Sequence, residues 1–178
     1  MANEAWQFPS PSPEDTRRTA RALAAAAGTD GLVISLVGPL GAGKTVFAKG
    51  VAEGCGLDPA AVASPTFVIA SEYPLPRGNV FVHVDLYRVE SAAELEGAGF
   101  LDWLDPGNLV VIEWGDRFPE ALPVDRLEIS IRRSESPGDG DARAVHALSS
   151  GPDSAAVLAR WRSSGPGRTT RGIDRLHR

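Results

Sequence analysis

The sequence has one cysteine, two lysines and no apolar stretch that approaches the length of a membrane span. Because Cys55 is alone, the chain can form neither an intrachain disulfide nor a metal site built from several cysteines. Residues 1–7 lack the basic and then apolar layout of a signal peptide. We therefore expect a cytoplasmic protein that does not contact a membrane.

Basic charge is also scarce over most of the chain. The net charge is −5, and residues 160–178 contribute +5, which leaves −10 for residues 1–159. An acidic body argues against a broad nucleic-acid-binding face. We expect one domain over residues 1–150, followed by an extension rich in Arg, Gly and Ser over residues 151–178 that is disordered at least from residue 163.

The sequence does contain a complete phosphate-binding loop (P-loop). Residues 38–45 match G-x-x-x-x-G-K-[ST] between an apolar run, residues 32–37, and a helical pattern, residues 44–55. Such a loop holds phosphates by its amides and lysine, and its hydroxyl binds Mg²⁺; a glycine turn that only ends a strand is the alternative. The predicted nucleotide-binding residues are Gly38, Leu40, Gly41, Ala42, Gly43, Lys44 and Thr45.

Helices and strands alternate around this loop. Ser12 and Pro13, followed by two acidic residues, begin a helix that should end near Ala27, before Gly28. Strands are predicted over residues 32–37, 66–73, 80–87, 109–112, 126–132 and 143–148, with short helices over 91–97 and 100–104. The second and third strands should pair antiparallel, and the last two should form a hairpin at the sheet edge. This predicts an α/β fold, a P-loop NTPase-like three-layer sandwich with a mostly parallel central sheet and antiparallel edge strands.

Two strand ends carry carboxylates suited to magnesium chemistry. Glu113 follows an apolar strand, at the edge where ligands of open α/β sheets bind, and is predicted to hold Mg²⁺ with Thr45. An ordinary solvent-facing acid is the alternative. Strand alternation places His83, Asp85 and Tyr87 on one face, where Asp85 would orient the attacking water or join the magnesium shell. A solvated face of an edge strand explains this triplet equally well.

The segment Ser64-Pro65-Thr66-Phe67 is a hydroxyl-bearing turn just before a predicted strand. Thr66 would serve as a switch residue that contacts the γ-phosphate or Mg²⁺ and moves on hydrolysis. From the chemistry alone, a simple helix-to-strand connection is the favoured interpretation.

Taken in order, these motifs resemble the bacterial TsaE family of small ATPases. The resemblance covers about residues 10–133: the P-loop, then Ser-Pro-Thr-Phe, then Glu72-Tyr73, then the series His83-x-Asp85-x-Tyr87-Arg88, then Ile-Glu-Trp at 112–114. It implies an ATP-hydrolysing, Mg²⁺-dependent subunit required for threonylcarbamoyladenosine modification of tRNA beside the anticodon. It also implies partners, a threonylcarbamoyl transferase subunit and its pseudo-enzyme partner, with tRNA contacted only indirectly.

The resemblance further implies roles for single residues. Lys44 would bind the β- and γ-phosphates and act with Asp85 in catalysis. Thr45 and Glu113 would hold Mg²⁺. The residues linked to the switch or the partner would be Thr66, His83, Tyr87, Arg88 and Trp114. No arginine finger occupies a motif position, although Arg88 is a candidate, so we expect slow hydrolysis by the isolated protein and stimulation by the partner.

The chain departs from the family pattern at Pro39, where an acidic residue is common, and at Gly115, where proline often follows the Glu-Trp pair. Pro39 has no N–H, which removes one amide from the loop. Two other functions share the P-loop: a small metabolite kinase and a nucleotide-gated adaptor without turnover. Residues 89–108 lack the arginines of a kinase lid, and an adaptor needs no paired carboxylates at the γ-phosphate.

Overall fold

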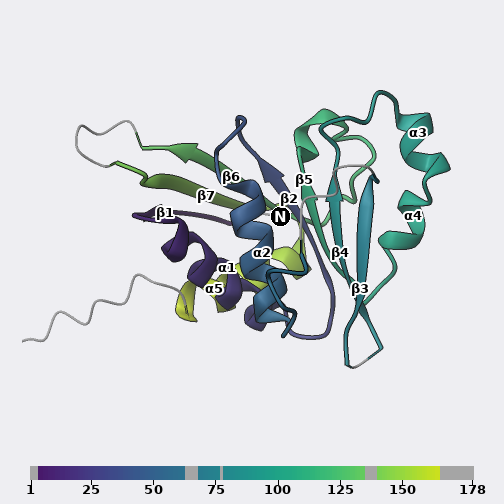
Figure 1. Cartoon of the computed structure of the whole chain (residues 1–178). Coiled ribbons are helices and arrows are strands. Elements are labelled where there is room, and N and C mark those ends of the chain that lie inside the picture. Colours follow the sequence, from purple (N-terminus) through teal and green to yellow (C-terminus); the bar gives the residue numbers. More distant parts are fainter. Residues whose placement is uncertain (1–3, 63–67, 77, 135–139, 165–178) are drawn as a thin grey trace, which may run out of the picture.

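One seven-stranded mixed sheet organises this α/β protein, whose computed structural model describes residues 4–62, 68–76, 78–134 and 140–164 (Figure 1). Its elements in chain order are β1 (Ala5–Ser10), α1 (Pro13–Ala27), β2 (Leu32–Val37), α2 (Lys44–Gly54), β3 (Ala70–Pro74), β4 (Val80–Asp85), α3 (Ala92–Gly97), α4 (Phe100–Trp103), β5 (Leu109–Glu113), the 3₁₀ helix η1 (Gly115–Arg117), β6 (Leu127–Arg133), β7 (Arg143–Ser149) and α5 (Pro152–Ser164).

The strand order is β1-β7-β6-β2-β5-β4-β3. The four central strands, β6, β2, β5 and β4, run parallel to one another. The outer strands β1, β7 and β3 pair antiparallel. The predicted parallel centre with antiparallel edges is thus confirmed. Strand β3 begins at Ala70, and residues 66 and 67 of the predicted strand lie outside the described residues.

Helices cover both faces of the sheet (Figure 1). Because side chains alternate along a strand, each buried strand contributes to two cores. On one face Ile34, Val111 and Ile129 pack in the same core as α1, α2 and α5. On the other face Val84 and Ile112 pack in the same core as α3 and α4. Within the described residues, no helix is long and apolar enough to cross a bilayer.

Helices α1 and α2 approach each other closely. Ser12 begins α1 as predicted, because its Oγ accepts a hydrogen bond from the Asp15 N–H at 3.1 Å. Gly50 and Gly54 lie one turn apart on α2, and a Cβ on either would overlap the α1 backbone at Arg17 or Arg21. The absence of side chains at these glycines therefore allows α2, the helix that follows the P-loop, to pack this close to α1.

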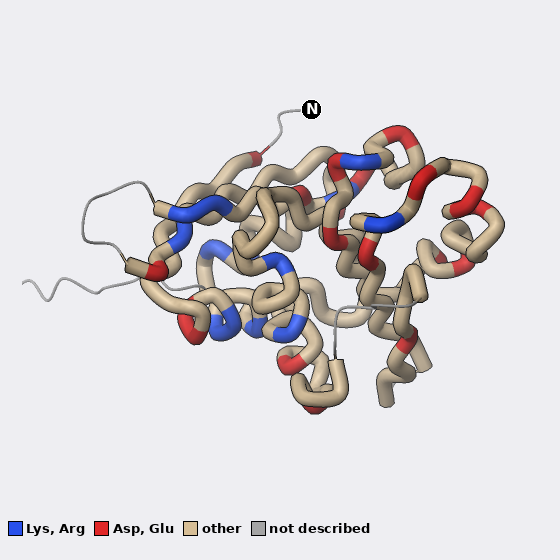
Figure 2. The backbone as a smooth tube through the Cα atoms, turned by 45° about the horizontal axis from the view of Figure 1, so that its top comes forward, with Lys and Arg blue, Asp and Glu red and all other residues tan. Residues whose placement is uncertain are grey.

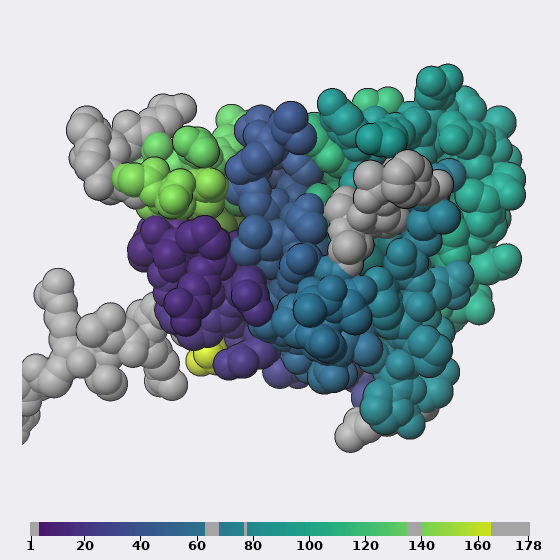
Figure 3. All heavy atoms as spheres, viewed as in Figure 1, coloured from purple at the N-terminus to yellow at the C-terminus, as the bar shows by residue number. Residues whose placement is uncertain are grey.

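Strand β1 is an element that the sequence analysis did not predict. It pairs antiparallel with β7, from Ala5 opposite Leu148 to Ser10 opposite Arg143. In Figure 3 the purple amino-terminal residues accordingly lie against the green residues near the other end of the chain. The β6–β7 hairpin was expected at the sheet edge, but β1 covers β7 and takes that place.

Helix α5 extends the domain past the predicted boundary at residue 150, through Ser164. Trp161 of α5 is fully buried, and its Nε1 donates to the Thr19 backbone oxygen at 2.9 Å. Its ring meets those of Trp6, Phe8 and Phe47 nearly edge-on, with centroids 5.0, 5.6 and 6.1 Å away. Residues 163 and 164, expected to be disordered, belong to the last turn of this helix, because Trp161 anchors it in the core; residues 165–178 lie outside the described residues.

Charge is distributed unevenly over the fold (Figure 2). Acidic residues predominate on the side of α3 and α4, and basic residues gather around α1 and the adjoining ends of β6 and β7. The segment 89–108, which contains both short helices, has five acidic residues and neither lysine nor arginine. The negative net charge of the chain is therefore concentrated on one side of the molecule.

We predict that Trp161→Ala lowers the free energy of unfolding by about 3–5 kcal/mol, because it removes a buried aromatic ring and leaves a cavity. Arg162→Ala on the exposed side of the same helix should change it by less than about 0.5 kcal/mol. Urea denaturation of both variants measures the difference. If the two variants are equally stable, α5 is not part of the cooperative domain.

Candidate nucleotide-binding site

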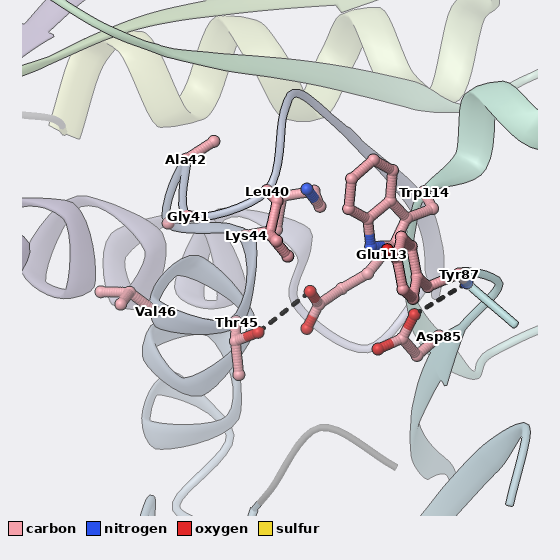
Figure 4. Close-up of a pocket in the computed structure, with 11 residues that line it drawn as sticks. Leu40, Gly41, Ala42, Lys44, Thr45, Val46, Asp85, Tyr87, Glu113 and Trp114 are labelled. Atoms are coloured by element: carbon pink, nitrogen blue, oxygen red, sulfur yellow. Dashed lines mark hydrogen bonds between the residues drawn. The ribbon is translucent and has the colours of Figure 1, made fainter. Parts of the chain in front are cut away.

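The carboxyl ends of β2, β4 and β5 meet at one edge of the sheet. The parallel register pairs Glu113 with Leu36 on one side and with Asp85 on the other. A hollow of about 340 Å³ opens between these strand ends and α2 (Figure 4). Its lining residues are Leu40, Gly41, Ala42, Gly43, Lys44, Thr45, Val46, Asp85, Tyr87, Glu113 and Trp114.

The backbone at the start of α2 is arranged to face an anion. Gly43 is the N-cap residue with φ 111°, and it provides no side chain to pair the first amides of the helix. By contrast, α1 and α3 are capped by the hydroxyls of Ser12 and Ser91. Uncapped amides and the positive end of the helix dipole favour a phosphate at this place. Pro39, which departs from the family pattern, still makes a backbone hydrogen bond within the loop, because its carbonyl oxygen accepts from the Ala42 N–H at 3.1 Å.

Lys44 turns back onto its own loop and is 4% exposed. Its Nζ donates to the backbone oxygens of Gly38 at 2.7 Å and Pro39 at 3.0 Å. The same ammonium lies 3.5 Å from the centre of the Trp114 ring, a cation–π contact. Burial lowers the pKa of Lys44, and the nearby carboxylates, Glu113 foremost, partly oppose that shift.

Glu113 is buried, with 3% of its surface exposed, so the solvent-facing alternative for this residue is wrong. Its Oε2 accepts from Thr45 Oγ1 at 3.0 Å, and its Oε1 lies 2.9 Å from His83 Nε2. The structure thus brings together the two residues predicted to hold a metal ion. A hydroxyl and a carboxylate are oxygen donors of the kind that Mg²⁺ prefers.

Of the three residues predicted to share one face, His83 and Asp85 lie on β4, whereas Tyr87 lies beyond its end. His83 is fully buried, so the alternative of a solvated face is wrong for this residue. Asp85 is the last residue of β4 and lines the hollow, and its Oδ1 accepts from the Tyr87 N–H at 2.9 Å. Tyr87 lies past the strand, where its ring packs at a tilt of 38° against Trp114, with centroids 4.9 Å apart. In Figure 4 the carboxylates of Asp85 and Glu113 face the same space.

Three described residues predicted for the site do not line the hollow: Gly38, His83 and Arg88. Gly38 borders a second hollow that Trp114 also lines. Glycine is required at this position, because its φ is 148° and because a Cβ would overlap the Ile131 backbone oxygen. Arg88 is exposed and contributes nothing to the lining of the hollow. Thr66, the predicted switch residue, lies outside the described residues.

Sequence reasoning missed Arg143, which supports the P-loop from the start of β7. Its Nε donates to the backbone oxygen of Ala42 at 2.9 Å, across 101 positions of sequence. An isolated arginine at the start of a strand gives no local signal of such a contact. Only the pairing of β7 within the sheet brings Arg143 to the loop.

The second departure from the family pattern, glycine at position 115, is explained by the contact of this residue with Ser35. Trp114 has φ 61° and is the one non-glycine residue with positive φ in the described part of the chain. It turns the backbone so that Gly115 packs directly on Ser35, where a Cβ on Gly115 would overlap the Ser35 hydroxyl. That hydroxyl is buried and has no hydrogen-bond partner among the described residues. In this chain, therefore, Ser35 occupies the space that a larger residue 115 requires.

Comparison with known proteins identifies the family. The family described as threonylcarbamoyl adenosine biosynthesis protein TsaE matches residues 10–143. The chain belongs to the TsaE family. This confirms the family predicted from the motifs and its connection with tRNA threonylcarbamoyladenosine biosynthesis. The TsaE match includes every element that borders the hollow and ends before α5.

Individual TsaE relatives agree with this assignment. The tRNA threonylcarbamoyladenosine biosynthesis protein TsaE of Bacillus subtilis is 41% identical over 126 residues, which cover 69% of this chain and 75% of the relative. The protein of the same name from Streptomyces coelicolor is 41% identical over 119 residues, which cover 66% and 76%. A crystal structure of Bacillus subtilis YdiB aligns with a TM-score of 0.70 and 28% identity, over 92% of this chain and 98% of that one.

We predict that Gly115→Ala destabilises the protein by about 1–3 kcal/mol, because its Cβ overlaps Ser35. Ser35→Ala should be nearly neutral, since it removes a buried hydroxyl that has no described partner. The double variant should therefore regain at least half of the stability lost in Gly115→Ala. Thermal denaturation measures all three variants, with Gly97→Ala, where a Cβ meets nothing within 4 Å, as the control. Strictly additive effects in the double variant would contradict the overlap.

Proposed function

We propose that this protein binds ATP with Mg²⁺ and hydrolyses it in support of tRNA threonylcarbamoyladenosine formation. The observation that carries the proposal is the hydrogen bond from Thr45 to Glu113, placed beside the uncapped start of α2. It joins the hydroxyl of a P-loop to a carboxylate at the end of the neighbouring parallel strand, the arrangement by which P-loop NTPases hold magnesium. We accordingly assign the fold to the P-loop NTPase-like class.

The residues present fit Mg²⁺ only together with a nucleotide. In the described ranges, no three side chains of His, Cys, Asp or Glu gather as a metal site of their own. Thr45 and Glu113 supply two oxygens, and Mg²⁺ characteristically completes its shell with phosphate oxygens and water. When bound, the ion would neutralise charge that develops on the phosphates. Nucleotide and metal are therefore expected to bind together.

The contacts of Lys44 support slow turnover by the isolated protein. Two of its donors are taken by the carbonyls of Gly38 and Pro39, and its charge lies over Trp114. A phosphate that recruits Lys44 must compete with these contacts. Trp114, Tyr87 and the 79% exposed Leu40 form an apolar rim on the hollow, which suits a protein partner better than solvent.

We infer that this partner is the threonylcarbamoyl transferase subunit with its pseudo-enzyme partner. The B. subtilis and S. coelicolor relatives are named as proteins of the same tRNA modification. The net negative charge of the chain supports indirect involvement of tRNA, because phosphate backbones are bound by basic surfaces. The protein would then work in the cytoplasm, with turnover serving the chemistry of its partner.

We predict that Lys44→Met weakens binding of Mg²⁺ and ATP about 10- to 100-fold, the equivalent of one or two charge-assisted hydrogen bonds. Lys49→Met is the matched control, because Lys49 is the only other lysine and does not line the hollow. Isothermal titration calorimetry measures both variants. If Lys44→Met binds as tightly as Lys49→Met, the phosphate site lies elsewhere.

Turnover tests the proposed activity directly. We predict that the transferase and its pseudo-enzyme partner raise the rate of phosphate release by the wild-type protein at least about tenfold. Asp85→Ala and Glu113→Ala should abolish this stimulation, since both carboxylates border the hollow. Nucleotide binding without release of phosphate would identify an adaptor, and transfer of phosphate to a small molecule would identify a kinase. A wild-type protein that neither binds these partners nor gains activity would contradict the proposal.

A further inference from the structure

His83 is a polar side chain among apolar neighbours. It lies in the middle of β4 with none of its surface exposed, between Val82 and Val84 along the strand. Its Nε2 is 2.9 Å from Glu113 Oε1, whereas its Nδ1 is buried and has no hydrogen-bond partner among the described residues. A carboxylate only accepts hydrogen bonds, so Nε2 is the donor in this pair.

The unpartnered nitrogen shows that packing alone does not explain a histidine here. Burying a polar atom without a hydrogen bond costs free energy, and an aliphatic side chain such as the neighbouring valines would avoid that cost. What the imidazole adds at this position is the single bond to Glu113. The histidine therefore contributes by holding Glu113, whereas filling the core at this position needs only an aliphatic side chain.

The bond to His83 determines how Glu113 presents its second oxygen. With Oε1 held by Nε2, Oε2 faces Thr45 Oγ1 at 3.0 Å. Without His83, Oε1 would lie buried with no donor, and the carboxylate would be free to rotate about its last side-chain bond. His83 does not line the hollow itself, so it can act on a bound group only through Glu113.

We propose that His83 is a positioning residue that orients the Glu113 carboxylate, together with Thr45, toward the magnesium ion of a bound nucleotide. The inference rests on the proposed function and adds to it a residue that acts on the metal site from within the sheet. Partners that hydrogen-bond a metal-binding group from behind commonly change metal affinity by about 10- to 100-fold. His83 should therefore control the response to Mg²⁺ and leave the contacts between the loop and the phosphates intact.

The test uses the whole chain with His83→Leu, His83→Gln and the control Val84→Ala. Leucine removes the donor, whereas the amide nitrogen of glutamine reaches about as far as Nε2 and can still donate to Oε1. Val84 is buried on the opposite face of the same strand and belongs to the other core, so Val84→Ala reports the effect of lost packing alone. Binding of a fluorescent ADP analogue is measured in EDTA and over a series of Mg²⁺ concentrations.

We expect His83→Leu to raise the Mg²⁺ concentration for half-maximal effect at least about tenfold, with the affinity in EDTA unchanged. His83→Gln should recover most of the wild-type response, and Val84→Ala should retain it fully even if its melting temperature falls. In turnover assays the loss in His83→Leu should be recovered by added Mg²⁺, so that kcat at saturating Mg²⁺ approaches the wild-type value.

Two results would overturn the inference while leaving the proposed function intact. One is a wild-type Mg²⁺ response in His83→Leu. The other is a glutamine variant whose Mg²⁺ response is as weak as that of leucine; if His83→Leu does not fold, the comparison of His83→Gln with wild type and Val84→Ala decides. Nucleotide binding by the wild-type protein that does not depend on Mg²⁺ at all would instead overturn the proposed function, and this inference with it.

Discussion

The buried carboxylate of Glu113 is the constraint on which the site depends. A charged group taken out of water must be hydrogen-bonded, and among the described residues each Glu113 oxygen has a partner, Thr45 on α2 or His83 on β4. These partners come from different elements, so the carboxylate is accommodated only when β4 and β5 pair in the observed register and α2 packs against the end of β5. The hydrogen bonds that satisfy Glu113 thus also assemble the edge of the sheet where a nucleotide would bind.

The opposite flank of the molecule supports the same site through packing. Trp161 of α5 contacts Phe47, which belongs to the first turn of α2 just after the P-loop. Gly50 and Gly54 hold α2 close against α1, and Arg143 fastens the loop itself through the Ala42 carbonyl. Helix α5, which lies in the segment that composition alone suggested was an appendage, therefore helps to fix the helix that would receive the phosphates. This explains why β1 and α5 are integral parts of the domain.

Most of the fold could be predicted from local pattern. Two elements, β1 and α5, were not predicted, and each omission has a physical cause. In β1, Trp6, Phe8 and Ser10 alternate with exposed residues, but Pro9 and the short length obscured the strand. In α5 the apolar residues Val157 and Trp161 lie four positions apart, yet arginine and serine around them hid the periodicity. Both elements depend on contacts with distant segments, since β1 needs β7 and α5 needs α1 and β1. Local pattern is weakest for elements that are stabilised in this way.

The sequence by itself determined the chemistry of the site: the P-loop, a carboxylate at the end of an apolar strand, and the order of motifs that characterises the TsaE family. The P-loop is encoded locally, because its backbone amides, lysine and hydroxyl lie within eight consecutive residues, and the other motifs are each short segments of sequence. Only the tertiary structure decided which groups meet: His83 with Glu113, Lys44 with Trp114, and Arg143 with the loop. These pairs lie far apart in the sequence, so their contact follows from strand order and register, which no single segment contains.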